Sequence, residues 1–456
     1  MGSPWTYSPR HESSSVSGVR VVSVLALTYR MVVGTARVAS PILSLGGSKL
    51  ARGVAGHRRA HEVLAAWGRT FRDPARPAVW FHAPSVGEGL QARAVIDAMR
   101  ELLPDMQVVY TFFSPSAEDL ARGMGADIAT YLPWDLKGPA SVALDAVRPE
   151  LLVFTKTEVW PVLADEARRR GVPLAIVGAS VPEGAGRTRW PARSLLRPTW
   201  RSLAVACANS EADAGRLTGL GVERSRVHDV GDPGIDSAAQ RVGVADPAAA
   251  YLAPFLADAR PTLVAGSTWP ADEAALVPAL REVRLRVPDV RAIIAPHEPD
   301  ERHVLPLMES LASGGWTSAT LSDVEASGSA SGVDAVVVDR VGVLAHLYTV
   351  GAVAFVGGGF HDAGLHSVLE PAAARVPIAF GPRHHNARAA GDLLAEGGAR
   401  VANDSGSLAE IVTGWLTDDA RREHAARQAF AYIDAHRGAS ARSARLLEAL
   451  ITPSQA

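Results

Sequence analysis

The alternation of two kinds of segment constrains the fold of this chain more than any other feature. From Ala78 onward, short apolar runs rich in β-branched residues alternate with Ala-, Leu- and Arg-rich stretches of helical periodicity. The first half contains the strand-like runs AVWFHA, MQVVYTFF, ADIATYL, ELLVFTK, VPLAIVGAS and SLAVACANS, with helix-like stretches such as LQARAVIDAMRELL among them. This order predicts a parallel sheet with helices on both faces.

The alternation pauses after GDPGID (231–236), where AAQRVGVADPAAAYLAPFLADAR is rich in Ala and Pro and is not periodic. It resumes with the strand-like runs PTLVAGST, VRAIIAPH, DAVVVD, VAFVGGG and VPIAFGP. The segment SGGWTSATLSDVEASGSASGVD (313–334) predicts an exposed loop. We therefore predict an α/β protein with two Rossmann-like doubly wound domains, at residues 51–240 and 241–456, that face a central ligand cleft. Two such halves in tandem resemble the two-domain glycosyltransferase architecture known as GT-B.

Composition excludes several classes of protein. With 456 residues, 47% hydrophobic and 21% charged, the chain is neither disordered throughout, nor collagen-like, nor a disulfide miniprotein. Its single cysteine, Cys207, cannot form an internal disulfide or a Cys-rich zinc site, which favours a reducing cytosol. The 46 basic and 48 acidic residues give a formal charge of −2, which argues against a nucleic-acid partner.

The N-terminal segment is distinct from the rest of the chain. Residues 1–18 are polar and predict a flexible tail, whereas residues 19–50 predict an amphipathic membrane-anchoring helix. Arg20, Arg30 and Arg37 fall within about a 100° arc of the helical wheel, opposite an apolar face. An arginine at the bilayer centre costs about 2.5–3.5 kcal/mol, so a helix lying in an anionic membrane surface is favoured over a span. A buried core helix with snorkelling arginines is the alternative. Four more cations follow: Lys49, Arg52, Arg58 and Arg59.

Two glutamates follow predicted strands of the first half. Glu88 lies in HAPSVGEG (82–89), where a strand ends and a helix begins, and Glu158 lies in FTKTEVWP (154–161). Ligands bind at the carboxyl ends of the strands in open α/β sheets, so both glutamates are candidate site residues. The alternative for Glu88 is a first-turn charge that merely favours its helix dipole.

The second half has its own candidate ligand segments. GSTWPADE (266–273) and APHEPDER (295–302) follow its first two strands and offer hydrogen-bond donors for an anion. FVGGGFHDAGLHSVLEPA (355–372) contains three glycines that allow close approach of a ligand, and it predicts a helix beginning near Ser367 that carries Glu370. No HExxH or DxD pattern occurs, and the adjacent His384 and His385 cannot both bind one ion from a strand, so no metal and no cofactor are expected.

These segments together resemble a known family. In order, HAPSVGE, TFFSPS, YLPWD, KTEVWP, GSTWPADE, APHEPDER, GVLAHLY, FVGGGFHDAGLHSVLEPA and FGPRHHN are similar to the 3-deoxy-D-manno-octulosonic acid (Kdo) transferases. Each motif is weak alone, but the ordered set is specific and extends over about residues 25–430. The resemblance implies an inverting glycosyltransferase that moves Kdo from the donor CMP-Kdo to a lipid A precursor, lipid IVA, in lipopolysaccharide biosynthesis. It also implies a location on the cytoplasmic face of the bacterial inner membrane.

The resemblance also implies roles for individual residues. Glu88 matches the family's general base, and Glu158 matches a second acidic position that is thought to stabilise the transition state. The expected CMP-binding residues lie in the second half, where a phosphate at a helix N-terminus needs no metal. They are Pro296, His297, Gly342, Val343, Leu344, Ser367, Val368, Leu369 and Glu370.

Two positions depart from the family pattern. Gly234 stands where the family has a cation, and Ser367 replaces an asparagine. Lys156, Arg187 or Arg189 would have to supply the charge that Gly234 lacks. Two alternatives therefore stay open: a related nucleotide-sugar transferase with another donor or acceptor, and a catalytically silent, membrane-associated protein that binds nucleotide.

Overall fold

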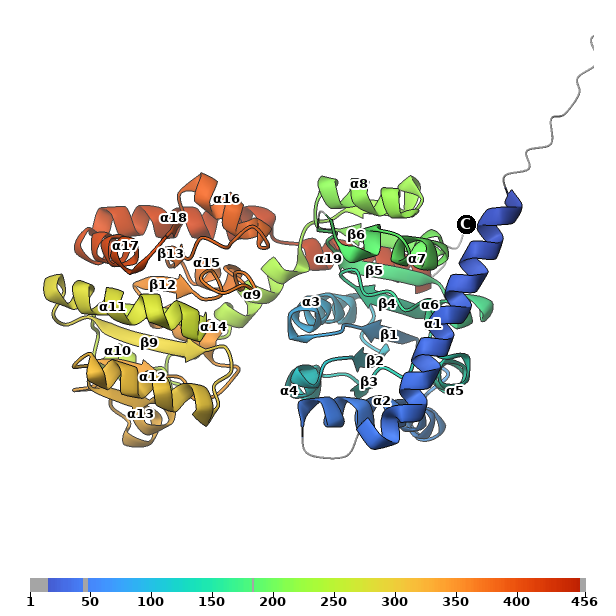
Figure 1. Cartoon of the computed structure of the whole chain (residues 1–456), viewed down its shortest axis with the longest axis horizontal. Helices are drawn as coiled ribbons and strands as arrows, with labels where there is room; N and C mark the ends of the chain where they lie inside the picture. The colour runs from blue at the N-terminus through green and yellow to red at the C-terminus, as the bar shows by residue number, and fades with distance from the viewer. Residues whose placement is uncertain (1–14, 44–47, 183, 452–456) are drawn as a thin grey trace, which may run out of the picture. The chain divides into compact units, whose positions relative to one another are not determined.

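The computed structural model describes residues 15–43, 48–182 and 184–451, with side chains in the first helix described from residue 24 to 41. The chain forms two compact units, each described by itself below. Unit 1 comprises Met1–Pro233 and Gly438–Ala456, and unit 2 comprises Gly234–Arg437. Figure 1 shows the last helix, α19 (Ala439–Ile451), in red among the blue and green elements of unit 1.

Unit 1 is built on a parallel sheet of seven strands in the order β3-β2-β1-β4-β5-β6-β7. The order reverses beside β1, as in doubly wound folds. The strands are β1 (Ala78–His82), β2 (Gln107–Phe112), β3 (Ile128–Tyr131), β4 (Leu151–Thr155), β5 (Leu174–Ala179), β6 (Leu203–Ala208) and β7 (Val227–Asp229).

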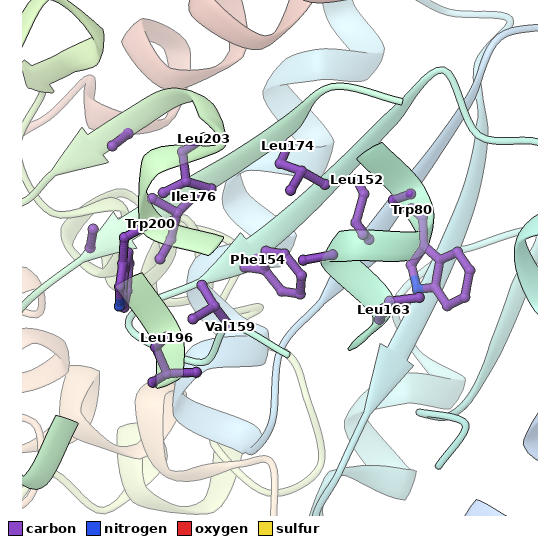
Figure 2. Close-up of a cluster of buried hydrophobic side chains, with 14 of the residues drawn as sticks. Trp80, Leu152, Phe154, Val159, Leu163, Leu174, Ile176, Leu196, Trp200 and Leu203 are labelled. Atoms are coloured by element: carbon purple, nitrogen blue, oxygen red, sulfur yellow. The ribbon is translucent and has the colours of Figure 1, made fainter. Parts of the chain in front are cut away.

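Helices cover both faces of this sheet, so its central strands are buried throughout and read as continuous apolar runs. Alternate residues face opposite sides. On one face, Trp80 and Phe154 pack with Trp200 in the cluster drawn in Figure 2. On the other, Phe81 and Val153 pack beneath α3 and α19. The helices are α2 (Lys49–Thr70), α3 (Val86–Leu102), α4 (Glu118–Arg122), α5 (Lys137–Val147), α6 (Pro161–Arg169), α7 (Ala192–Arg201), α8 (Glu211–Leu220) and α19, with short 3₁₀ turns η1 (Pro115–Ala117), η2 (Gly186–Thr188) and η3 (Arg224–Arg226).

The first helix, α1 (Ser15–Leu43), contacts α2 and α7 of unit 1. The Tyr29 hydroxyl donates a hydrogen bond of 2.9 Å to Asp135, which fixes α1 to the body of the unit. Apolar side chains nevertheless remain exposed along α1, including Leu27 (60%), Met31 (65%) and Val38 (80%). Within the described ranges, no helix has a stretch long and apolar enough to cross a bilayer.

Unit 2 repeats the architecture with a parallel sheet in the order β10-β11-β9-β8-β12-β13-β14. Its strands are β8 (Thr262–Thr268), β9 (Arg291–Pro296), β10 (Ser318–Thr320), β11 (Ala335–Val337), β12 (Val353–Val356), β13 (Ile378–Phe380) and β14 (Ala399–Val401). Its helices are α9 (Pro233–Gly243), α10 (Ala253–Ala257), α11 (Pro270–Arg286), α12 (Glu301–Ser313), α13 (Leu321–Ser327), α14 (Leu344–Leu347), α15 (Leu369–Ala373), α16 (Arg388–Glu396), α17 (Ser405–Thr417) and α18 (Asp419–His436), with the 3₁₀ turn η4 (Tyr348–Val350). Leu280 of α11, Trp415 of α17 and Phe355 of β12 share one core cluster.

The structure corrects two expectations about loops. The segment 313–334 is not an exposed loop, because it contains β10 and α13, and Leu321 and Val324 are buried in the core. Thr320 caps α13 by accepting a hydrogen bond from the Asp323 N–H. The non-periodic segment after residue 236 contains α9 and α10, and Phe255 anchors α10 in a core cluster.

The expected divisions of the chain also differ from those observed. The units divide between Pro233 and Gly234 rather than at residue 240. The second domain does not continue to residue 456, because Ala444 and Leu447 of α19 pack into the core of unit 1. The predicted flexible tail, 1–18, lies largely outside the described residues, and its last four residues are helical.

Candidate active site

Glu88 lies where β1 passes into α3, as predicted. Ser85 precedes the helix in an extended conformation, and its hydroxyl donates a hydrogen bond to Glu88 Oε2 instead of capping a backbone N–H. Lys156 Nζ lies 3.1 Å from the other oxygen, Oε1. Burial acts to raise the pKa of Glu88, but the Lys156 charge and the hydrogen bonds from Ser85, Lys156 and the Glu88 backbone outweigh it, so the pKa lies below its usual value. Glu88 is therefore a carboxylate at neutral pH.

Lys156 sits at the end of β4, directly beside β1 in the sheet. Its backbone adopts a left-handed conformation with φ of +61°, and its N–H donates to the Val177 carbonyl at 2.9 Å. This conformation is uncommon outside glycine and asparagine. It turns the chain so that the lysine side chain reaches Glu88.

Glu158 lies in the same loop and has a different partner. Arg187 of η2 donates to the Glu158 carboxylate and also to the Thr157 carbonyl. Burial lowers the pKa of Arg187. The structure thus brings both predicted glutamates to the carboxyl edge of adjacent strands, each paired with one of the cations considered as a replacement at Gly234.

His82, the last residue of β1, is fully buried. Trp160 Nε1, which can only donate, lies 2.9 Å from His82 Nε2, so that nitrogen must be the acceptor. Nδ1 therefore carries the proton and faces Thr111 at 3.1 Å. Burial lowers the pKa of His82 to about 3. The histidine nearest to Glu88 in sequence is neutral and enclosed, so it does not compete as a base.

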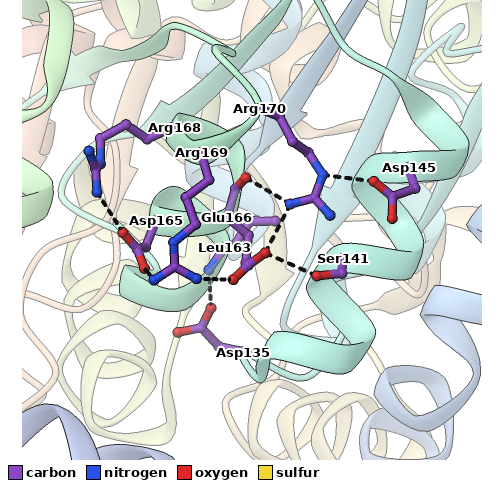
Figure 3. A network of polar contacts seen from close by, with 9 residues as sticks. All are labelled: Asp135, Ser141, Asp145, Leu163, Asp165, Glu166, Arg168, Arg169 and Arg170. Carbon is purple, nitrogen blue, oxygen red and sulfur yellow. Dashed lines mark hydrogen bonds and ion pairs between the residues drawn. The ribbon is translucent and has the colours of Figure 1, made fainter.

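Asp135, in the motif YLPWD, holds the start of α6, which follows Glu158. It is buried and accepts hydrogen bonds from the N–H groups of Val162 (3.1 Å) and Leu163 (2.7 Å). Burial raises its pKa to about 6. Figure 3 shows the polar network around this helix, in which Glu166 accepts from Ser141 of α5 and from Arg169 and Arg170. The role of Asp135 was not predicted from the sequence, because its hydrogen-bond partners lie 27 and 28 residues further along the chain.

In unit 2, Pro296 ends β9 and His297 follows it at the carboxyl edge of the sheet. The His297 N–H donates to the Thr268 carbonyl at 2.8 Å. Trp269 stacks on His297 and on His361, with ring centroids 4.5 Å apart in each case, and His366 stacks on His297 at the same distance. We call Trp269, His297, His361 and His366 the ring cluster. The sequence reading named only His297 among its members.

The ring cluster is uncharged at His366. Trp269 Nε1 donates to His366 Nε2 at 2.9 Å, and burial lowers the pKa of His366 to about 4. Its members come from the loops after β8, β9 and β12, whose carboxyl ends meet at one edge. The result is a set of flat, stacked rings with ring nitrogens at their margins.

The glycine triplet has a structural task. A side chain at Gly357 would collide with the Ser267 carbonyl at 2.3 Å, and one at Gly359 would collide with Gly381 at 2.4 Å. These glycines let backbone segments approach one another. The prediction from the sequence was close approach of a ligand. The fully buried Asp272 fixes the arrangement by accepting from the N–H groups of Gly358 (2.7 Å), Phe360 (3.0 Å) and Trp269 (2.9 Å).

The remaining predicted donor residues occupy two further loops. Gly342 has a φ of +93°, Val343 precedes α14 and is almost buried, and Leu344 begins that helix. α15 starts at Leu369 rather than near Ser367, and the Ser367 hydroxyl accepts from the Leu369 N–H at 3.3 Å. Val368 is buried in a core cluster of unit 2.

Glu370 is paired within unit 2. Arg241 of α9 contacts Glu370 Oε1, and the two side chains are 29% and 14% exposed. Arg241 was not anticipated, because it lies in the segment read as non-periodic. The ion pair uses Oε1, so Glu370 Oε2 can accept a hydrogen bond from another donor.

Three side chains near the start of α12 could hold a metal ion. Ligand atoms of Glu298, Asp300 and His303 lie within 4.8 Å of one another. Asp300 already accepts from Arg302 and lies 2.7 Å from His303 Nδ1. Beside this group, a groove of about 340 Å³ runs between α11 and α12 and is lined by Pro270, Glu273, Ala274, Val277, Pro278, Arg281, Arg302, His303, Pro306, Leu307 and Ser310.

Comparison with known proteins agrees with this arrangement. Residues 58–236 match the family described as 3-deoxy-D-manno-octulosonic-acid transferase (kdotransferase). The 3-deoxy-D-manno-octulosonic acid transferase of Bordetella pertussis is 28% identical over 389 residues, which cover 82% of this chain and 88% of that protein. The enzyme of the same name from Haemophilus influenzae is 22% identical, with coverage of 82% and 87%.

Among solved structures, UDP-GlcNAc 2-epimerase from Neisseria meningitidis, bound to UDP-GlcNAc, aligns with a TM-score of 0.56 at 12% identity, covering 82% of this chain and 99% of that one. That likeness concerns the fold: two parallel-sheet α/β domains of the GT-B kind. The sequence matches are more specific than the fold: residues 58–236 match the 3-deoxy-D-manno-octulosonic acid transferase family, and 82% of the chain is similar to enzymes of that name.

Proposed function

We propose that this protein transfers Kdo from CMP-Kdo to a lipid A precursor, lipid IVA, with inversion at the anomeric carbon. The observation that carries the proposal is the match to Kdo transferases, which begins with the family segment in unit 1 and extends over 82% of the chain in the relatives. The carboxylate at Glu88 supplies the base that transfer to a hydroxyl requires.

In this proposal Glu88 accepts the proton of the acceptor hydroxyl while that oxygen bonds to the anomeric carbon. Glu158 acts beside it, with its charge balanced by Arg187. Because Glu158 keeps its position through the Arg187 contacts, it is suited to stabilising charge rather than to taking up a proton.

The CMP moiety is proposed to bind at the carboxyl edge of the sheet in unit 2. Pro296 and His297 present one margin of the ring cluster, and the exposed Gly342 leads into Val343 and Leu344 at the start of α14. Ser367–Glu370 supply backbone groups and the free oxygen of the Glu370 carboxylate for ribose hydroxyls. None of these contacts requires a metal.

The acceptor carries acyl chains, so the enzyme has to work at a membrane. We propose that α1 rests on the cytoplasmic surface of the inner membrane, because Leu27, Met31 and Val38 are exposed while Tyr29 fastens the helix to unit 1. Each cation near an anionic membrane surface strengthens membrane binding by about 1 kcal/mol. Replacing Leu27 and Met31 by glutamate should move the protein from sedimented anionic vesicles to the supernatant, whereas the same change at Leu285, exposed on α11, should not.

The function is tested by incubating the purified full chain with CMP-Kdo and tetraacylated lipid A precursor and measuring the mass of the lipid product. A mass increase of one or more Kdo units supports the proposal. Folded protein that binds CMP and yields no product contradicts it.

A second candidate rests on Gly234, in the first turn of α9, where a cation is expected from the family pattern. It is a relative that binds nucleotide without turnover, or one that uses another donor. Thermal protection distinguishes these cases: protection by CMP and not UDP favours a CMP-sugar donor, and protection by UDP favours another donor.

A further inference from the structure

We propose that Lys156 is a positioning residue whose ammonium group keeps the Glu88 carboxylate charged and in one orientation, ready to accept a proton. The inference rests on the proposed function, because it gives Lys156 a role in the step assigned to Glu88.

The two oxygens of Glu88 are held separately. Lys156 Nζ contacts Oε1 at 3.1 Å, and the Ser85 hydroxyl donates to Oε2. Two contacts on different atoms fix the rotation of the carboxylate about its last bond, which one contact alone cannot do. The Glu88 side chain is 14% exposed, whereas Lys156 is 44% exposed, so water reaches the pair from the lysine side.

The backbone at Lys156 is costly to form. A non-glycine residue in the left-handed region is strained, and such residues cluster at active sites and ligand-binding sites. The Lys156 N–H bond to the Val177 carbonyl holds this conformation at the end of β4. Asparagine or glycine would fit this backbone conformation better. The contact of the lysine side chain with Glu88 explains why lysine stands here.

Two titratable groups act on Glu88 in the described part of unit 1: Lys156, from the loop after β4, and Tyr110, from β2. Burial raises the pKa of Tyr110, so it stays neutral throughout the working range. Lys156 is therefore the charge that offsets the burial of Glu88. Removing it should raise the pKa of the Glu88 carboxyl.

The reaction then balances without a further partner. The acceptor oxygen forms a bond to the anomeric carbon as its proton passes to Glu88. The bond between that carbon and the phosphate oxygen breaks, and its electron pair leaves with CMP. The positive charge of Lys156 beside Oε1 favours loss of the proton from Glu88 to solvent before the next cycle.

The test compares Lys156→Asn with Lys156→Arg. Asparagine tolerates the left-handed backbone but removes the charge, whereas arginine keeps the charge. The acid limb of the pH profile of kcat/KM should move upward by on the order of one pH unit in Lys156→Asn and by much less in Lys156→Arg. Lys137→Asn, at an exposed position on α5, is the matched control and should leave the profile unchanged. An acid limb in Lys156→Asn that coincides with the parent overturns the inference.

A second measurement needs no turnover. Thermal stability of the parent, Glu88→Gln, Lys156→Asn and the double variant gives a coupling between the two side chains. A coupling free energy at pH 7.5 that disappears at low pH supports the proposed interaction of Lys156 with the Glu88 carboxylate. No coupling at pH 7.5 overturns the inference. Lack of product from the parent with CMP-Kdo contradicts the proposed function separately, because the coupling does not depend on the substrate.

Discussion

The carboxyl edges of the two sheets differ in chemistry although the sheets share one architecture. In unit 1 the edge carries two carboxylates against cations, Glu88 with Lys156 and Glu158 with Arg187. In unit 2 it carries the ring cluster, with an ion pair at Glu370. Both edges contain an indole N–H that donates to a histidine Nε2 at 2.9 Å.

The difference indicates separate tasks for one kind of scaffold. An ionised carboxylate that solvent can reach is able to accept a proton, which is what a hydroxyl acceptor demands. Flat stacked rings and backbone groups suit recognition of a nucleotide, which has π faces and hydrogen-bonding edges. If this division is correct, changes at the two edges should affect different measurements.

The largest effect is expected from Glu88→Gln. Glutamine keeps the size of the side chain but cannot take up the proton, so kcat should fall by about 10²–10⁴. CMP affinity, assigned to unit 2, should stay within twofold. Steady-state rates and calorimetric titration with CMP measure the two quantities. Glu101→Gln, at an exposed position on the same helix, is the control. A folded Glu88→Gln variant that turns over within a few-fold of the parent would leave Glu88 with only its helix-terminus role.

The histidines at the two edges predict how acid destabilises the protein. Burial lowers the pKa of His82 to about 3, below the ordinary value of 6.5, so between these pH values the unfolded chain binds a proton that the folded unit does not. The free energy of unfolding should therefore decrease as pH falls from 6.5 towards 3, by roughly several kcal/mol. Burial lowers the pKa of His366 to about 4, so unit 2 should respond in the same direction over a narrower window.

Urea unfolding between pH 7.5 and 4.5 measures this dependence. His82→Gln should flatten the curve, because glutamine has no proton to take up, whereas His385→Gln, at an exposed position, should not. Parallel curves for parent and His82→Gln would mean that other groups govern acid unfolding.

A smaller effect on stability is expected from Asp272→Ala in unit 2. The substitution removes the acceptor of three backbone N–H groups, one in a buried and two in partly buried hydrogen bonds, so the free energy of unfolding should fall by about 3 kcal/mol. Asp362→Ala, whose side chain is 92% exposed beside Arg383, should change it by less than about 0.5 kcal/mol. Equal effects of the two substitutions would show that Asp272 does not organise this edge.

Local patterns in the sequence were sufficient for much of the fold. Continuous apolar runs predicted strands of both sheets, and the strand-to-helix transitions placed Glu88 and Glu158 at the correct edge. The segment 313–334 was misread because β10 is three residues long and α13 seven, too short for periodicity to stand out from Gly and Ser. The return of α19 to unit 1 depends on packing between residues about 350 positions apart, which no local pattern encodes.

Local patterns placed Glu88 and Glu158 at the carboxyl ends of their strands, but the partners of the candidate site residues were not predictable. The pairing of Glu370 with Arg241 joins α15 to α9, and the ring cluster joins three loops, so both depend on tertiary structure. The glycine triplet was read as a ligand loop because close approach of a backbone to a ligand and to another backbone require the same residue. Only coordinates separate those two reasons for a glycine.

The smallest effect is expected at Glu370, where the comparison between the edges can be refined. Glu370→Ala should weaken CMP binding about tenfold, since a hydrogen bond to a charged group contributes roughly 1.5 kcal/mol. Arg241→Met should weaken it less, because the arginine contacts Glu370 Oε1 and is proposed only to orient the carboxylate. The control is Glu325→Ala on α13, which breaks the ion pair between Glu325 and Arg340. Calorimetric titration with CMP measures these affinities, and unchanged affinity in Glu370→Ala would remove this residue from the donor site.

The same titration should give one affinity with and without EDTA, since the predicted contacts use no metal. A loss of affinity in EDTA would direct attention to Glu298, Asp300 and His303 instead.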